Sequence, residues 1–345
     1  MMRFHTLGNT DISVSSLCLG TMTFGGQNSQ EEAFDQLDFA IGQGINFLDT
    51  AEMYAIPTSI NTYGNTERII GKWIHQRANR HEIVLATKVT GPSRIKHIRN
   101  GKARLDKVNI QQAIDGSLQR LKTDYIDIYQ LHWPDRHTNF FGSLSYQHDK
   151  HASETPIEET LCALSEFIQA GKIRAIGISN ETAWGAMTYL NLADQLNLPR
   201  VVTIQNPYNL LNRSFELNLA EISHREKLSL LAYSPLAFGV LTGKYIHSKP
   251  DNARCTLFKE FKRYFTASSL KATRKYAELA MQHNLSFAQM SLAFVNQQPF
   301  LGSTIIGATN IEQLSENIQS LDILLDDGII KSINKIHAEH TFPSP

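Results

Sequence analysis

The stretch SQEEAFDQLDFAIGQGINFLD, residues 29–49, predicts a helix followed at once by a buried strand. Ser29 and Glu32 have the spacing of a capping box, and apolar side chains then recur every three or four residues, as on one face of a helix. A glycine ends this pattern, and the apolar run 45–48 that follows brings Asp49 to the carboxyl end of a strand. The stretch is therefore typical of one unit of a parallel βα repeat.

The same order of helix and strand recurs along the chain. Short apolar runs separated by helical patterns are typical of βα units that form a parallel sheet. Thr155 and Glu158 predict a second capping box at the start of a later helix, with proline at its first position. Eight runs qualify as strands: 16–19, 45–48, 83–88, 125–132, 173–179, 201–205, 228–233 and 303–306.

Eight parallel strands with helices between them predict the α/β class and a (β/α)8 TIM barrel, with residues 1–345 as one domain. Runs 4–7 and 12–14 flank a turn, so we expect an N-terminal β-hairpin before the first barrel strand. Stretches 134–154 and 237–268 are too long for simple connections. We expect them as long loops at the C-terminal face, where barrel active sites lie.

Charge and composition exclude several classes of function. Lys plus Arg number 33 and Asp plus Glu number 33, so there is no basic footprint for nucleic acid or an anionic membrane. No apolar run reaches the roughly 18 residues of a membrane helix, and residues 1–10 lack a signal-peptide core. The 3 cysteines are far apart and form no CxxC pair. We expect a cytoplasmic protein with reduced thiols, no metal site and a small-molecule substrate.

Polar and ionisable side chains gather where the predicted strands end. Each has an ordinary structural explanation by itself, such as a turn-forming aspartate, a lysine that reaches solvent or a hydrogen-bonded core histidine. Random placement does not fill so many separate strand ends with such groups, and barrel active sites are built at this face. The set therefore favours an active site: Asp49, Tyr54, Lys88, His132, Ser179, Asn180, Gln205 and Tyr233.

The run GINFLDTAEMY, residues 44–54, resembles the G-x-N-x-x-D-T-A-x-x-Y signature of the aldo-keto reductases. Further motifs match this family in order along essentially the whole chain: ATK at 86–88, LHWP at 131–134, GISN at 177–180, QNPY at 205–208 and YSPL at 233–236. Within the family, the chain is similar to a Tas-like subgroup at 20–29, 133–142, 204–216 and the tail 342–345.

The resemblance implies that Asp49, Tyr54, Lys88 and His132 form the catalytic set. Reduction of a carbonyl needs a hydride at carbon and a proton at oxygen, and a phenol held against the oxygen can give the proton. A free tyrosine titrates near pH ~10, and a neighbouring ammonium favours the phenolate. Asp49 would pair with Lys88, and His132 would donate a hydrogen bond to the carbonyl oxygen.

The resemblance also implies NADP(H) as the cofactor, lying across the barrel mouth. No G-x-G-x-x-G loop follows a predicted strand, which disfavours a Rossmann site. Ser179, Asn180 and Gln205 offer the donors and acceptors that a carboxamide requires, and Tyr233 would stack on the nicotinamide. The other expected cofactor contacts are Ser234, Leu236, Gly243, Gly307, Thr309, Gln313 and Asn317.

Residues 307–317 match the family segment that binds the adenosine 2′-phosphate at a helix N-terminus. Many members carry Lys at the position of Gly307 and Arg at that of Gln313, and neither is present here. The choice of NADPH over NADH therefore rests on the resemblance and not on these residues.

The predicted function is NADPH-dependent reduction of an aldehyde or ketone, with the proton from Tyr54. Met22, Phe24, Trp133 and residues 139–141 could line an apolar substrate pocket. One alternative is a nicotinamide-binding regulatory or sensor subunit with little turnover, because potassium-channel β subunits resemble the same superfamily. Another is a Schiff base on Lys88, as in aldolases, which leaves Tyr54 without a role.

Overall fold

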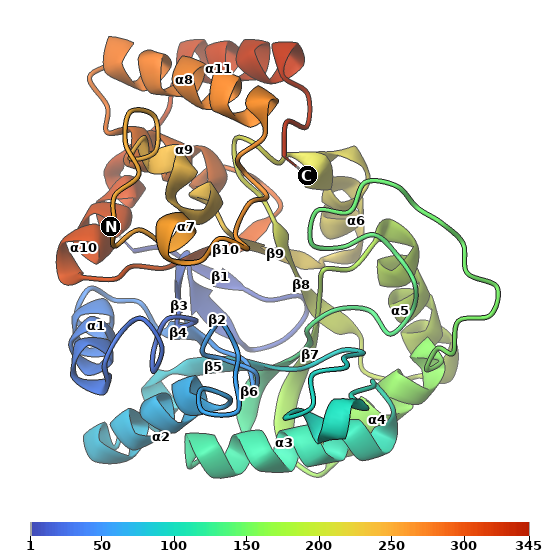
Figure 1. The fold of residues 1–345 in the computed structure, drawn as a ribbon. Coiled ribbons are helices and arrows are strands. Elements are labelled where there is room, and N and C mark those ends of the chain that lie inside the picture. The colour runs from blue at the N-terminus through green and yellow to red at the C-terminus, as the bar shows by residue number, and fades with distance from the viewer. Residues whose placement is uncertain (1, 345) are drawn as a thin grey trace.

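Eight parallel strands close into a barrel in the computed structural model, which describes residues 2–344 (Figure 1). The barrel closes because β10 pairs with both β9 and β3. Around the barrel the strands are β3 (Leu17–Gly20), β4 (Phe47–Asp49), β5 (Val84–Val89), β6 (Ile126–Leu131), β7 (Ile173–Ser179), β8 (Val201–Pro207), β9 (Ser229–Tyr233) and β10 (Leu301–Ile306). The predicted TIM barrel is confirmed, with most strand ends shifted by one or two residues from the expected runs.

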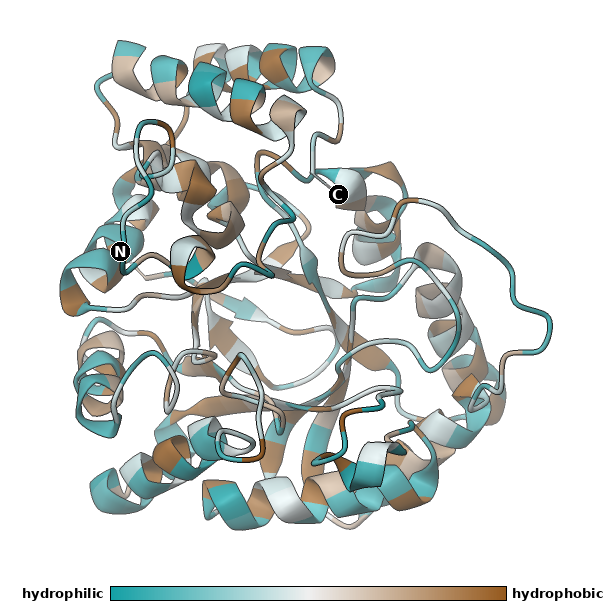
Figure 2. Cartoon of the chain, viewed as in Figure 1, coloured by the Kyte–Doolittle hydropathy of each residue, from teal (hydrophilic) through white to brown (hydrophobic). Residues whose placement is uncertain are grey.

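Helices surround the barrel in Figure 1, and Figure 2 shows apolar strands inside with hydrophilic residues along the outer helices. None of the helices within residues 2–344 is both long and apolar enough to cross a membrane. The α-helices are α1 (Gln30–Gly42), α2 (Asn65–Arg77), α3 (Lys107–Leu121), α4 (Ile157–Gln169), α5 (Ala183–Leu196), α6 (Leu219–Glu226), α7 (Arg254–Leu257), α8 (Ala267–Gln282), α9 (Phe287–Asn296), α10 (Ile311–Gln319) and α11 (Asp327–Glu339). The 3₁₀ turns are η1 (Arg80–Glu82), η2 (Arg99–Gly101), η3 (Ser214–Leu217), η4 (Ala237–Thr242) and η5 (Ser320–Asp322).

One of the two predicted capping boxes is present. At the start of α1, Glu32 N donates to Ser29 Oγ at 3.2 Å, and Ser29 N donates to Glu32 Oε2 at 2.8 Å. The box predicted at Thr155 is wrong, because the N-cap of α4 is Pro156 and makes no side-chain cap. Thr155 Oγ1 instead donates at 2.6 Å to the buried carboxylate of Asp135, a stronger acceptor than a neutral group.

The predicted hairpin forms from β1 (Phe4–Thr6) and β2 (Ser13–Ser15), which pair antiparallel. Its apolar residues Leu7, Ile12 and Val14 are buried together with inward side chains from the first residues of the barrel strands, such as Phe47 and Val84. The hairpin therefore seals the amino end of the barrel. The carboxyl ends of the strands, with their polar side chains, lie at the other end.

The barrel interior changes from apolar to polar along β4 and β5. On β4, Phe47 at the sealed end gives way to Asp49, and on β5, Val84 gives way to Lys88. Side chains two residues apart on a strand face the same way, so these pairs share the interior. The polar groups therefore meet in one layer at the carboxyl ends of the strands.

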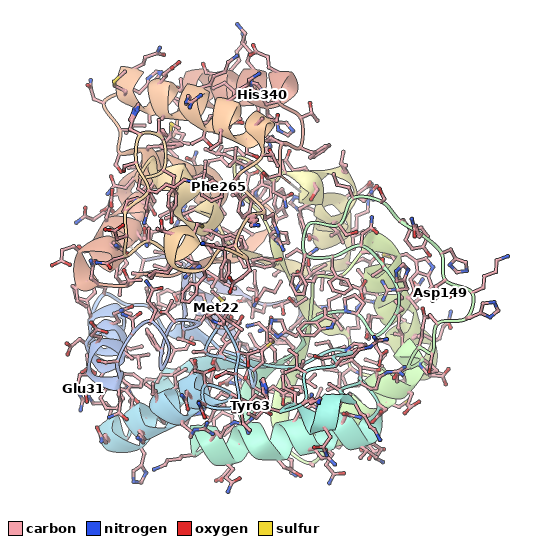
Figure 3. The ribbon with its side chains drawn as sticks, in the orientation of Figure 1. Met22, Glu31, Tyr63, Asp149, Phe265 and His340 are labelled. Carbon is pink, nitrogen blue, oxygen red and sulfur yellow. The ribbon has the colours of Figure 1, made fainter. Side chains whose placement is uncertain are left out.

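The two long stretches differ from simple loops. The ends of the first meet at Asp135, which accepts hydrogen bonds from Arg104 Nε, from Leu105 N at 2.8 Å and from Thr155 Oγ1. Between these ends the chain swings away from the barrel, and Asp149 lies at its outer edge in Figure 3. The second stretch, 237–268, was expected as a loop but contains η4, α7 and the first residues of α8.

Candidate active site

Lys88 and Asp49 form an ion pair inside the barrel. Lys88 Nζ lies 2.6 Å from Asp49 Oδ2 and donates a second hydrogen bond of 2.7 Å to the backbone oxygen of Thr50. Burial lowers the pKa of Lys88, but interactions with the Asp49 carboxylate and with Tyr54 outweigh burial, so the pKa is raised. Lys88 is therefore an ammonium ion at neutral pH, in a place where only a paired charge is tolerated.

Two glutamines hold the other oxygen of Asp49. Gln130 Nε2 on β6 donates to Asp49 Oδ1 at 2.9 Å, and Gln205 Nε2 on β8 donates to the same atom at 2.8 Å. Gln205 Nε2 also donates to Gln130 Oε1 at 3.0 Å. A Cβ at Gly177 would lie 2.9 Å from Gln130 Cγ, so the glycine on β7 leaves room for this side chain. The carboxylate is thus fixed from three sides.

Tyr54 lies beside both Lys88 and His132. Lys88 Nζ is 4.9 Å from the centroid of the Tyr54 ring. The ring centroids of Tyr54 and His132 are 5.8 Å apart, with an edge-to-face angle of 75°. Burial raises the pKa of the Tyr54 phenol, Lys88 lowers it and Asp49 raises it, with a raised pKa as the result. The expected effect of Lys88 is present, but burial outweighs it, and the phenol is protonated at neutral pH.

Glu52 anchors the segment that carries Tyr54. Its buried carboxylate pairs with Arg99 at 2.7 Å and accepts a hydrogen bond of 2.7 Å from Thr90 N, which follows β5. Tyr63 donates to the other Glu52 oxygen at 3.1 Å. This network ties the chain after β4 to the chain after β5, which brings Tyr54 next to Lys88.

His132 is a buried, neutral imidazole directly after β6. Burial, with a smaller effect of the Lys88 charge, holds the pKa of His132 well below its usual value. The buried Nδ1 atom has no hydrogen-bond partner among the described residues. Buried polar atoms are rarely left in this state. The Nδ1 atom of His132 is therefore available for a further hydrogen bond.

The residues that were expected to hold a carboxamide lie at the ends of β7, β8 and β9. Ser179 Oγ donates to the backbone oxygen of Gln205 at 2.8 Å. Asn180 Nδ2 donates to the backbone oxygen of His132 at 2.9 Å, and Asn180 Oδ1 accepts from the Tyr233 hydroxyl at 2.7 Å. Both N–H groups of the Gln205 amide are already used within the barrel. The structure thus places Ser179, Asn180, Gln205 and Tyr233 in one network next to His132.

The residues after β9 form a tight series of turns. Ser234 has a φ of 53°, and its backbone oxygen accepts from Ala237 N at 2.9 Å. Leu236 caps the start of η4 and Gly243 caps its end, with a φ of 83° that favours glycine. This path leads the chain directly into Lys244. The three expected cofactor residues Ser234, Leu236 and Gly243 therefore frame one turn at the rim.

A second cluster forms at the N-terminus of α10. Gln313 Oε1 accepts from Thr309 N at 3.1 Å and from Thr309 Oγ1 at 3.2 Å. Asn317 Nδ2 donates to the backbone oxygen of Gly307 at 3.3 Å. Asn28, in the loop after β3, donates to the backbone oxygen of Thr309 at 2.9 Å. Gly307, Thr309, Gln313 and Asn317 thus come together, in a cluster of their own.

Lys244 and Arg254 are two half-buried cations that the sequence analysis missed. Burial lowers the pKa of Lys244, and the Arg254 charge lowers it further. Burial also lowers the pKa of Arg254, and it outweighs Cys255, Tyr245 and Tyr54, which raise the pKa. Within residues 2–344, no carboxylate lies within ion-pair distance of either side chain. Two neighbouring cations without a carboxylate partner suit an anionic ligand.

The expected apolar pocket is only partly assembled. Trp133 packs on His132 with ring centroids 5.0 Å apart, and Phe141 packs on Trp133 at 5.7 Å. Phe24 is completely buried among the core residues behind the barrel wall, so its predicted place in a pocket is wrong.

Comparison with known proteins adds the following. The family described as the Aldo/keto reductase family matches residues 16–338. "Protein tas" of Escherichia coli is 51% identical, with 100% of each chain covered. "Uncharacterized oxidoreductase YrpG" of Bacillus subtilis is 34% identical, over 100% of this chain and 97% of its own. "Aldo-keto reductase" of Babesia bovis is 37% identical, over 74% of this chain and 96% of its own.

Proposed function

This chain belongs to the aldo/keto reductase family, and on that premise we propose that it reduces aldehydes or ketones to alcohols with NADPH. The observation that carries the proposal is the Lys88 ammonium, paired with Asp49 at 2.6 Å and placed 4.9 Å from the ring centroid of Tyr54. A cation so close to a phenol favours loss of the phenolic proton, which is what protonation of a substrate oxygen requires.

Tyr54 is the proton donor in this proposal. Its raised pKa keeps the hydroxyl protonated before reaction, and the Lys88 charge stabilises the phenolate that remains when the proton moves to the carbonyl oxygen. Asp49 holds the Lys88 ammonium toward the ring, and the two glutamines hold Asp49. The proton therefore leaves one specific oxygen, beside a fixed positive charge.

His132 orients the carbonyl group. A neutral imidazole has one N–H to donate, and burial keeps His132 neutral by holding its pKa well below the usual value. A hydrogen bond from this ring to the carbonyl oxygen polarises the C=O bond and holds the oxygen next to Tyr54, whose ring centroid is 5.8 Å away. A charged imidazole would compete with Tyr54 as the acid.

The residues at the mouth fit a nicotinamide dinucleotide. Ser179 and Asn180 would hold the carboxamide with the Oε1 atom of Gln205, and Tyr233 would lie against the ring. The unpaired cations Lys244 and Arg254 would hold the phosphates, which supports a phosphate-bearing cofactor although Gly307 and Gln313 carry no charge. When bound, this cofactor supplies the hydride that the side chains cannot.

The Schiff-base alternative is disfavoured by the state of Lys88. A lysine that attacks a carbonyl must be an unprotonated amine. Here the pKa of Lys88 is raised, because Asp49 and Tyr54 outweigh burial. Its protons are also used in hydrogen bonds to Asp49 and to the backbone oxygen of Thr50.

NADPH-dependent reduction of 4-nitrobenzaldehyde by the wild type and by Tyr54→Phe tests the proposal. We expect turnover in the wild type and a loss of about 100-fold or more in kcat for the variant, because the acid is removed. Tyr146→Phe, which removes an exposed hydroxyl on the long loop, is the matched control and keeps full activity.

Titration of the same proteins with NADPH and NADH, followed by quenching of tryptophan fluorescence, separates the sensor alternative. Binding in the wild type and in Tyr54→Phe, with turnover in the wild type alone, supports a reductase. Tight NADPH binding without turnover of any carbonyl compound would support the sensor, and binding of neither nucleotide would contradict both.

A further inference from the structure

Arg263 is a half-buried cation that has no ion-pair partner among residues 2–344. It lies between α7 and α8, where its Nη1 atom donates to the Tyr233 hydroxyl at 3.5 Å. Burial lowers the pKa of Arg263, but Tyr233 and Tyr264 raise it. Both phenols have raised pKa values themselves, that of Tyr233 to about 12. At neutral pH, the two phenols that contact Arg263 are therefore uncharged.

Most other half-buried arginines of this protein have a carboxylate partner. Arg99 pairs with Glu52 at 2.7 Å, Arg120 with Glu67 at 2.6 Å, and Arg213 with Glu216 at 2.7 Å. In the part of the chain that the structure describes, Arg263 has no carboxylate within ion-pair distance. A partly desolvated guanidinium is costly without a negative partner, which points to a partner that is a ligand.

Two aromatic rings hold the Arg263 guanidinium in place. Its Cζ atom lies 5.9 Å from the centroid of Phe141 and 5.9 Å from that of Phe238. Phe141 comes from the stretch 134–154 and Phe238 from the stretch 237–268. A guanidinium that contacts aromatic rings in this way still has N–H groups available for hydrogen bonds to a ligand.

A row of aromatic rings connects Arg263 to the catalytic imidazole. His132 packs on Trp133 at 5.0 Å, Trp133 on Phe141 at 5.7 Å, and Phe141 lies under Arg263. Arg263 is also joined through the Tyr233 hydroxyl to Asn180, which donates to the backbone of His132. An apolar ligand segment along this row would run from a carbonyl near His132 to Arg263.

We propose that Arg263 binds the carboxylate of a substrate that carries its aldehyde or ketone at the other end of a short apolar body, such as a formyl- or keto-carboxylic acid. This inference rests on the proposed reductase function. A guanidinium forms two parallel hydrogen bonds to a planar carboxylate, and its single charge matches that of one carboxylate. Lys244 and Arg254, which lie together beside Cys255 and Tyr245, are left for the cofactor.

The test compares 4-carboxybenzaldehyde with methyl 4-formylbenzoate, which has nearly the same shape and no charge. We expect the wild type to prefer the acid, and Arg263→Gln to lower kcat/KM for the acid by about 10- to 100-fold, the usual value of hydrogen bonds to a charged group. The ester should change by less than about threefold, and Arg263→Lys should retain part of the preference. Lys262→Gln, an exposed neighbour on the same loop, is the control for a general loss of positive charge.

Equal losses for acid and ester, or a wild type without preference, would overturn the proposal. Loss of NADPH affinity in Arg263→Gln would also overturn it, since Arg263 would then belong to the cofactor site. Benzoate binding to the NADP⁺ complex, measured by calorimetry in wild type and Arg263→Gln, needs no turnover. Arg263-dependent benzoate binding without reduction of either aldehyde would support the carboxylate site while contradicting the proposed reductase function; benzoate binding that ignores Arg263 would contradict the site.

Discussion

A hydrogen bond of 2.9 Å crosses the barrel interior from Gln130 Nε2 on β6 to Asp49 Oδ1 on β4. Gln205 on β8 donates to the same oxygen, so three alternate strands meet at one carboxylate. Layers built from alternate strands are the usual way in which TIM-barrel interiors are filled. Here the uppermost layer is polar, and it positions the charge pair on which the proposed proton transfer depends.

Replacing Gln130 with methionine tests how far this layer contributes. Gln130→Met keeps the volume but removes a hydrogen bond to a buried carboxylate, so the free energy of unfolding should fall by about 1–3 kcal/mol in urea titrations. The kcat value should fall with it, because Lys88 loses a rigid partner. Gln111→Met, on the exposed face of α3, is the matched control. Equal stability of the two variants would contradict this role.

Lys88 and Asp49 should be strongly coupled in a double-mutant cycle. Lys88→Met leaves a buried carboxylate without its cation and should cost about 3–5 kcal/mol of unfolding free energy. Adding Asp49→Asn removes the unpaired charge, so the double variant should be more stable than Lys88→Met alone. Chemical denaturation measures both, and a double variant that is less stable than the single one would refute the coupling.

His132 should make the protein less stable in acid. Its pKa is held well below the ordinary value of 6.5 by burial, with a contribution from Lys88, so below pH 6.5 the unfolded chain takes up a proton that the folded protein refuses. Stability from this residue is therefore complete above pH 6.5 and lost as pH falls, by up to about 1.4 kcal/mol per pH unit. His132→Asn should show a smaller decline between pH 7 and pH 5 in urea titrations, and curves that remain parallel there would contradict the prediction.

Lys244 and Arg254 should govern nucleotide affinity. Lys244→Met and Arg254→Met should each weaken NADPH binding by about 10- to 100-fold, since each removes one charge from a phosphate site. A larger loss for NADPH than for NADH in either variant would assign that residue to the 2′-phosphate. Arg274→Met, exposed on α8, serves as the control in the fluorescence titration. Unchanged affinity in both rim variants would remove these residues from the cofactor site.

The fold could be predicted from local patterns because each βα unit carries its own signal. The capping box at Ser29 and the apolar run before Asp49 determine α1 and β4 without reference to the rest of the chain. Thr155 shows the limit of this approach, because its hydroxyl is taken by Asp135, a residue 20 positions away. A tertiary acceptor overrides a local cap, and its presence cannot be read from the spacing.

The candidate site was predictable where function concentrates polar residues at strand ends. Gln130 lies in the buried strand β6, two residues before His132. Its only signal in the sequence is that a polar residue occupies a position of β6 that faces the barrel interior. Lys244, Arg254 and Arg263 lie in a stretch without periodicity. Their significance comes from the absence of a carboxylate within ion-pair distance among residues 2–344, and that information exists only once the chain is folded.

The hydrogen bonds of Asp135 fix both ends of the segment between Asp135 and Thr155, so this segment can be exchanged as a unit. The Asp135 carboxylate accepts hydrogen bonds from Arg104 and Leu105 N, and also from Thr155 at the far end of the segment. A longer or shorter loop between Asp135 and Thr155 would therefore change the chain outside the barrel and leave the barrel itself unaltered. Phe141 is carried within this segment and lies against Arg263. Replacing the loop between Asp135 and Thr155 therefore offers a way to change substrate specificity without changing the residues proposed for proton transfer.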